Sequence, residues 1–196
     1  MAPGDEIPGW INLYAQLRQL VAGYHYGPFG DKKNMTVCST RQKKYGKACF
    51  FDVNTIAPQC TAAQNFGYKR QSPCVFIQFA NVTGWNPEPI LPREVSRTLP
   101  AALRPMVAPG LLLLHCDGDT PADREYIGPV TYSPYQGFRT EFFPYSGHPE
   151  YMPPMVAVQF LRPERGVVIG VRCRLWARNP PPGNASTEIQ FFLLVD

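Results

Sequence analysis

Residues 167–178 read VVIGVRCRLWAR, and their pattern indicates the fold. One set of alternate positions carries Val167, Ile169, Val171, Cys173 and Leu175, whereas the other set includes arginines. A period of two is typical of a β-strand with one face toward the core and the other toward water. The sequence therefore predicts a strand in which Cys173 points inward with the apolar set.

Further strand-like runs, bounded by turn residues, lie on both sides of this stretch. They are residues 47–53, 74–81, 110–117, 130–132, 138–142, 155–160 and 188–195. Because 22 prolines and 16 glycines interrupt the chain, long helices are excluded over most of it. Six of these prolines fall within residues 86–109, which we expect to form an extended crossover from one sheet to the other.

One helix is predicted, over residues 8–24. Its apolar residues recur at steps of three and four: Trp10, Ile11, Tyr14, Leu17, Leu20 and Val21. The polar face carries only Gln16, Arg18 and Gln19, so we expect the helix to pack on the body of the domain and not on a membrane surface. The predicted organisation is an N-terminal segment with this helix, residues 1–28, followed by a disulfide-bonded β domain, residues 29–196.

The composition favours a folded protein that does not bind nucleic acid. With 44% hydrophobic and 13% aromatic residues, the chain of 196 residues is long enough to bury one core. The excess of 19 Lys and Arg over 15 Asp and Glu gives a net charge of +4, and these residues are mostly scattered. Nucleic acid binding requires a denser basic footprint.

Cysteines and glycosylation motifs together point to the secretory route. The six cysteines form no C-x-x-C pair of the kind used for zinc or redox exchange, so structural disulfides are predicted, although fifteen pairings are open. Three N-x-[ST] motifs predict glycosylation. Their acceptors are Asn34, Asn81 and Asn184.

Neither a signal peptide nor a membrane span is visible in this sequence. Residues 1–8 lack the apolar region of a signal peptide, and no run approaches the ~20 apolar residues of a spanning helix. We therefore expect a membrane anchor upstream of this chain, or a secreted protein if the chain is naturally short.

Residues that could support catalysis, a cofactor or a metal are few. The histidines are His25, His115 and His148, and neither a G-x-S-x-G elbow nor a phosphate-binding glycine loop occurs. Asp117, Asp119 and Asp123 lack the turn glycine and terminal glutamate of a calcium loop, which indicates an acidic turn. The prediction is a protein without catalytic residues, cofactor or metal.

Several ordered motifs resemble the extracellular domain of sodium/potassium-transporting ATPase β subunits, which are subunits of P-type cation pumps. They are residues 34–38 (NMTVC), 48–50 (ACF), 72–78 (SPCVFIQ), 84–88 (GWNPE), 142–147 (FFPYSG) and 151–160 (YMPPMVAVQF). The resemblance covers the chain from about Trp10 to its end. One departure is Tyr145-Ser146-Gly147, where the family has Tyr-Tyr-Gly.

The resemblance implies a fold, a set of disulfides and a role. The fold is an immunoglobulin-like antiparallel β-sandwich. The implied disulfides are Cys38–Cys49, Cys60–Cys74 and Cys116–Cys173, the last acting as the inter-sheet bridge of such a sandwich. The implied role is that of a non-catalytic subunit on the extracellular side of the plasma membrane, which binds a P-type ATPase α subunit and assists its folding, trafficking and ion affinity.

Four aromatic residues are the candidate partner interface: Phe142, Phe143, Tyr145 and Tyr151. Prolines 144, 149, 153 and 154 would hold them stiff, as a preorganised interface requires. Two alternatives stay open. The aromatics could instead fill the core, and the domain could be a pump-independent adhesion or secreted recognition module that holds a β subunit or another surface protein in trans.

Overall fold

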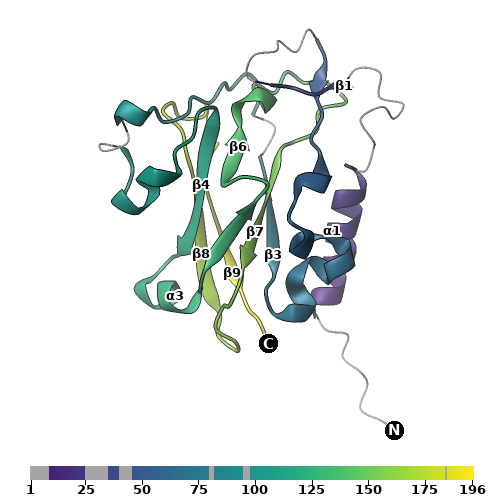
Figure 1. Cartoon of the computed structure of the whole chain (residues 1–196), viewed down its shortest axis with the longest axis vertical. Helices are drawn as coiled ribbons and strands as arrows, with labels where there is room; N and C mark the ends of the chain where they lie inside the picture. The colour runs from purple at the N-terminus through teal and green to yellow at the C-terminus, as the bar shows by residue number, and fades with distance from the viewer. Residues whose placement is uncertain (1–8, 25–34, 40–45, 80–81, 95–97, 184) are drawn as a thin grey trace.

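The computed structural model describes residues 9–24, 35–39, 46–79, 82–94, 98–183 and 185–196 (Figure 1). The strands are β1 (Met35–Thr36), β2 (Ala48–Cys49), β3 (Cys74–Gln78), β4 (Leu111–Gly118), β5 (Val130–Ser133), β6 (Gly137–Arg139), β7 (Met155–Phe160), β8 (Ile169–Trp176) and β9 (Glu188–Leu193). The α-helices are α1 (Gly9–Ala22) and α3 (Pro121–Tyr126). Short 3-10 helices are η1 (Val53–Thr55), η2 (Pro58–Cys60), η3 (Ala62–Arg70), η4 (Pro92–Glu94), η5 (Ala101–Met106) and η6 (Thr140–Phe142).

Two antiparallel sheets form the body of the protein. One has the strand order β3-β7-β5 and the other β6-β4-β8-β9. The sheets pack against each other: the Tyr132 hydroxyl on β5 accepts a hydrogen bond from the Cys116 N–H on β4 at 2.8 Å. The ring centroids of Phe160 on β7 and Phe191 on β9 lie 6.2 Å apart. The predicted mainly-β, antiparallel sandwich is confirmed.

Strand β8 has the predicted two-sided character. Ile169, Val171, Cys173 and Leu175 are buried, whereas Arg172 and Arg174 are exposed. Strand β7 differs, because all six of its residues are buried. It is the central strand of its sheet, and helix α1 with the η3 segment covers the sheet on the side away from β4 and β8 (Figure 1).

Helix α1 packs on the body of the domain, as its polar face predicted. Leu17, Val21 and Tyr24 belong to the main hydrophobic core. The ring centroids of Tyr14 and Phe66 lie 5.7 Å apart, which joins α1 to η3. Among the described residues, no helix has both the length and the apolar character needed to span a membrane.

The proline-rich segment of residues 86–109 connects the two sheets, as predicted, but it is not fully extended. It contains η4 and η5, and it carries a second, smaller hydrophobic core. Ile90, Leu99 and Leu103 pack there against Leu113 on β4. Two ion pairs fasten the segment to the chain just after β8, where Arg178 contacts Glu88 at 3.0 Å and Glu94 at 2.9 Å.

Two of the predicted strands give way in part to 3-10 helices. Within residues 47–53 only β2 is a strand, because the Asp52 side chain accepts a hydrogen bond from the Asn54 N–H and caps η1. Within residues 138–142 the strand β6 ends at Arg139, and η6 follows. In both places a short 3-10 helix replaces the expected strand.

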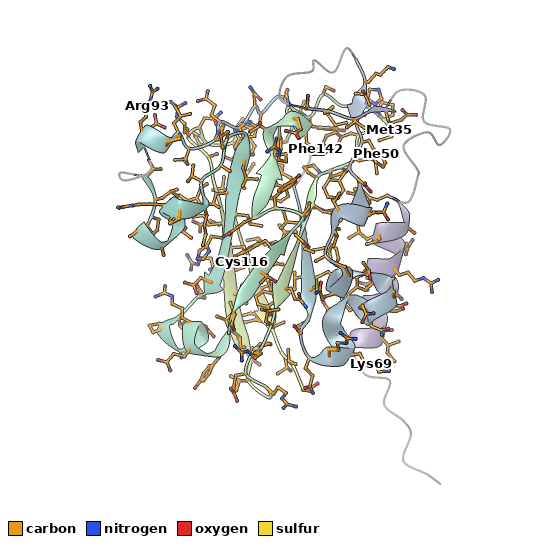
Figure 2. All side chains as sticks on the ribbon, viewed as in Figure 1. Met35, Phe50, Lys69, Arg93, Cys116 and Phe142 are labelled. Atoms are coloured by element: carbon orange, nitrogen blue, oxygen red, sulfur yellow. A yellow bond between two sulfur atoms is a disulfide. The ribbon has the colours of Figure 1, made fainter. Side chains whose placement is uncertain are left out.

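The three disulfides pair as the resemblance implied: Cys38–Cys49, Cys60–Cys74 and Cys116–Cys173. The expected inter-sheet character of the last bond is wrong. Cys116 on β4 and Cys173 on β8 are direct partners in one sheet, because β8 lies beside β4. Figure 2 shows Cys116 near the middle of the molecule. This bond therefore reinforces the four-stranded sheet and does not join the two sheets.

Candidate partner-binding site

Phe142, the last residue of η6, and Phe143 lie at the start of the aromatic loop. Both side chains are buried, at 9% and 6% exposure. The ring of Phe142 lies 5.8 Å from that of Phe51, and the ring of Phe143 lies 5.0 Å from that of Phe79 in an edge-on arrangement. The sequence left open whether the aromatic residues form an interface or fill the core. These two residues fill the core. Phe142 and Phe143 thereby fix the start of the loop to the hydrophobic core.

Tyr145 and Tyr151 form the part of the loop that reaches the surface. Both are half-buried, and their ring centroids lie 4.8 Å apart. The carbonyl of Tyr145 accepts a hydrogen bond from the Gly84 N–H at 3.1 Å, which ties the loop to the turn before Trp85. The Tyr145–Tyr151 pair is therefore held by this backbone hydrogen bond and by the tilted contact between its two rings.

Tyr24, at the end of α1, supports this pair from the interior. Its hydroxyl donates to the Pro153 carbonyl at 2.7 Å and accepts a hydrogen bond from the Gln78 amide at 2.6 Å. Burial raises the pKa of Tyr24 to about 12, against a smaller lowering by Gln78. The sequence analysis did not identify Tyr24 or Gln78 as part of the site, and their separation of 54 positions left no local signal.

The Tyr151 hydroxyl is buried, and it has no hydrogen-bond partner among the residues that the structure describes. Burial raises the pKa of Tyr151, and the nearby hydroxyls of Tyr24 and Tyr145 raise it further. The phenol is therefore neutral at physiological pH and carries an O–H group that can donate a hydrogen bond.

The prolines of the loop limit its freedom. Pro144 and Pro149 are exposed, whereas Pro154 is buried at the start of β7. Each proline fixes its own φ angle. A loop that is already ordered loses less conformational entropy on binding, which favours a contact surface.

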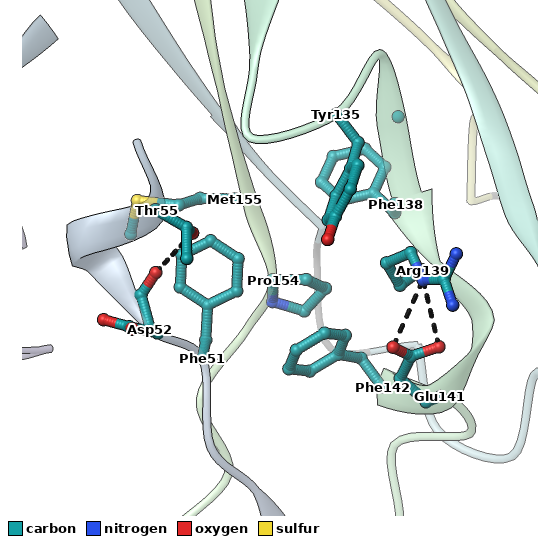
Figure 3. A pocket seen from close by; sticks show the side chains of 11 residues that line it. Phe51, Asp52, Thr55, Tyr135, Phe138, Arg139, Glu141, Phe142, Pro154 and Met155 are labelled. Atoms are coloured by element: carbon teal, nitrogen blue, oxygen red, sulfur yellow. Dashed lines mark hydrogen bonds and ion pairs between the residues drawn. The ribbon is translucent and has the colours of Figure 1, made fainter. Parts of the chain in front are cut away.

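A small cleft adjoins the loop (Figure 3). Its volume is about 130 Å³, and its floor includes Phe51, Phe142 and Pro154. At its rim the Arg139 Nε contacts the carboxylate of Glu141 at 3.2 Å, so these two charges neutralise each other. The cleft is an apolar socket of roughly the size that holds one aromatic ring, without a nucleophile and base in contact.

The described histidines and acidic residues take part in local contacts within the fold. His115 lies on β4, where burial lowers its pKa, while the Nδ1 of His148 accepts a hydrogen bond from the Glu150 N–H. Asp123 caps α3, and Asp119 pairs with Arg172 at 2.6 Å. No group of three potential metal-binding side chains occurs within the part of the chain that the structure describes. His25 lies outside that part.

The three predicted glycosylation sites, Asn34, Asn81 and Asn184, all lie outside the described residues. Their occupancy stays a prediction. The disulfide-bonded cysteines, in contrast, are all described.

The fold and the site define a class of protein: a disulfide-bonded antiparallel β-sandwich that presents a proline-stiffened aromatic loop. The chain belongs to the sodium/potassium ATPase beta chain family, whose model matches residues 10–189. The resemblance seen in the sequence motifs is thereby confirmed.

Curated relatives agree with this membership. The sodium/potassium-transporting ATPase subunit beta-2 of Drosophila melanogaster is 36% identical over 161 residues, which are 76% of this chain and 50% of that protein. Subunit beta-1 of the same organism is 33% identical, over 61% of this chain and 40% of its own length. A probable subunit beta-3 of Caenorhabditis briggsae is 30% identical, over 67% of this chain and 39% of its own length. The chain spans half or less of the length of these relatives.

Proposed function

We propose that this chain is the extracellular domain of a non-catalytic β subunit of a sodium/potassium-type cation pump. In this role it binds the catalytic α subunit, assists its folding and trafficking, and tunes its ion affinity. Membership of the β chain family carries the proposal. Three disulfides support a position on the extracellular side of the plasma membrane, because such bonds persist in oxidising compartments.

The Tyr145–Tyr151 pair is the contact that we propose for the α subunit. Its two rings are partly exposed and contact each other in a tilted arrangement, and the Tyr24 hydroxyl holds the nearby Pro153 carbonyl. Tyrosines in ordered surroundings are frequent binding hot spots, because they bury a large area and retain a hydroxyl. Phe142 and Phe143 act in this proposal as the buried support of the loop.

Co-assembly with an α subunit tests the proposal. A membrane-anchored form that contains this chain would be co-expressed with a P-type ATPase α subunit and recovered by precipitation of the α subunit. We expect the double variant Tyr145→Ala/Tyr151→Ala to reduce recovery at least about tenfold, since a hot spot contributes about 2 kcal/mol or more. Tyr126→Ala, which removes a tyrosine on α3 that is 38% exposed and lies outside both the loop and the cleft, is the matched control. Equal recovery of all three forms would contradict the assignment of this loop.

A second candidate function is pump-independent adhesion or recognition. It is favoured by exposed apolar side chains outside the aromatic loop, namely Val168 at 58%, Phe192 at 81% and Leu194 at 54% exposure. Apolar groups of this kind, when they lie together, mark interaction surfaces. Binding of the isolated domain to cells that lack an α subunit would support this candidate, and the absence of binding would argue against it.

A further inference from the structure

Strand β9 forms one edge of the four-stranded sheet, and one side of its backbone faces away from β8. The Leu175 N–H donates to the Thr187 carbonyl. Since bonded positions alternate along an antiparallel ladder, residues 189, 191 and 193 bond to β8. The N–H and C=O groups of Gln190 and Phe192 therefore point away from β8. Among the strands that the structure describes, none pairs with this side.

Apolar side chains are exposed on both faces of this edge. Ile189 lies opposite the buried Cys173, on the core face of the sheet, and is nevertheless 50% exposed. Phe192 lies opposite Gly170, on the outer face, and is 81% exposed. A lipid surface or a globular partner lying on the sheet would cover one face only. An additional strand beside β9 would cover both.

The edge lacks the features by which proteins usually prevent such pairing. Residues 188–195 read EIQFFLLV and contain neither lysine nor proline. The single charged residue, Glu188, lies 3.4 Å from Arg174 and 3.8 Å from Arg172, and its side chain stays 37% exposed. The edge therefore carries one accessible carboxylate and is otherwise rich in residues that favour strands.

In the three two-fold registers centred on Gln190, Phe191 and Phe192, a second copy of this chain matches the edge poorly. In a two-fold antiparallel pair that keeps like faces together, positions equidistant from the centre face each other. When the two-fold axis passes through Gln190, Glu188 of one copy faces Phe192 of the other copy. When the axis passes through Phe191, Glu188 faces Leu194 of the other copy. A pair centred on Phe192 sets Glu188 against Asp196, which is a like charge. Each of these registers leaves the Glu188 carboxylate beside an apolar or acidic side chain.

We propose that the edge of β9 binds an extended segment of a different polypeptide as an added antiparallel strand. The segment carries apolar side chains facing Ile189, Phe191 and Phe192, a polar one facing Gln190 and a basic one facing Glu188. Its backbone groups bond to those of Gln190 and Phe192, while its apolar residues cover both faces of the edge. This binding mode goes beyond the pump-subunit role, and it gives the second candidate function a specific surface.

A short capped peptide with the sequence Thr-Val-Val-Thr-Val-Lys follows this pattern and serves as the probe. Amide hydrogen exchange would be measured by NMR on the 196-residue chain with its disulfides formed. We expect saturable binding, with new protection of the Gln190 and Phe192 amides and little change at residues 189, 191 and 193. N-methylation of the second and fourth peptide residues, whose N–H groups face β9, should abolish binding. N-methylation of the third and fifth residues should preserve it.

Substitutions in the protein complete the test. Phe192→Ser should weaken binding about tenfold, because the outer-face contact is lost, and Met106→Ser, which removes an exposed apolar side chain on η5, should not. Equal binding of both methylated peptides, or no protection at Gln190 and Phe192, would overturn the proposal. Protection of the same amides in a peptide-free sample that dimerises would also overturn the proposal, since the partner would then be a second copy of the chain. Co-assembly with an α subunit probes the Tyr145–Tyr151 loop, so failure of either proposal is distinguishable from failure of the other.

Discussion

Cys116 and Cys173 face each other on neighbouring strands of one sheet and are joined by a disulfide. The bond connects residues that are 57 positions apart in the chain, whereas Cys38 and Cys49 are separated by 11. In the chain-entropy account, a longer closed loop removes more freedom from the unfolded state. The bond across β4 and β8 is therefore expected to contribute most to stability.

Removal of individual disulfides tests this order. The double variant Cys116→Ala/Cys173→Ala should lower the free energy of unfolding by about 4 kcal/mol, and Cys38→Ala/Cys49→Ala by about 3 kcal/mol. Urea denaturation at fixed pH measures both values. A larger loss for the Cys38–Cys49 pair would show that native packing, and not loop closure, determines the contribution.

Gly137 is predicted to be irreplaceable at the start of β6. Its φ is +145°, and a Cβ at this position would overlap the carbonyl oxygen of Leu112 on β4. We expect Gly137→Ala to destabilise the protein by about 3 kcal/mol or more, since strain and a backbone clash combine. Gly147→Ala is the control: its φ is also positive, at +77°, but a Cβ there meets open space, so about 1 kcal/mol is expected. Similar thermal midpoints for the two variants would contradict the role of the clash.

Asp123 makes stability dependent on pH in the acid range. Hydrogen bonds from the Thr120 side chain, and then from the Gly170 N–H, hold the pKa of Asp123 below its ordinary value of 3.8. The ionised form therefore stabilises the fold. This contribution is fully present above the unfolded-state pKa and is lost as the pH falls through the folded-state pKa.

Comparison with Asp123→Asn measures this effect. At about pH 6 the variant should unfold at a lower temperature than the parent, and the difference should shrink below about pH 4. Glu125→Gln, which removes an exposed carboxylate from the same helix α3, is the matched control and should show no such trend. A difference that is constant at all pH values would contradict a role for the charge.

Phe66 and Phe192 are expected to differ strongly in their effect on stability. Phe66 is completely buried and packs between Tyr14 of α1 and Phe76 of β3. Phe66→Ala should cost about 3–5 kcal/mol, whereas Phe192→Ala, at 81% exposure, should change the free energy of unfolding by less than about 0.5 kcal/mol. Chemical denaturation tests both. A large loss for Phe192→Ala would mean that this ring stabilises the fold and is not kept for a partner.

The strands were predictable where burial alternates along the chain. The pattern of residues 167–178 predicted β8 and the inward direction of Cys173, because exposure to water selects the residue types on each face. The η3 segment was not predicted. Asn65 and Phe66 both have positive φ angles there, and no turn glycine at either position signals this conformation.

The candidate site was predictable only in outline. The motif at residues 142–147 identified the aromatic loop, but not the division between Phe142 and Phe143, which are buried, and Tyr145 and Tyr151, which reach the surface. The support from Tyr24 depends on a contact with Pro153, 129 positions away. Such long-range contacts arise from the packing of the sheets and leave no mark in local sequence.

The crossover of residues 86–109 has a consequence for how the protein can change over time. Ile90, Leu99 and Leu103 pack against Leu113 in a cluster separate from the main core. Substitutions in this segment therefore act on the sheets through Leu113 and the partly buried Trp176, and not through the main core. The crossover is thus a separately packed unit, whose own packing can loosen while the interior shared by the two sheets stays in place.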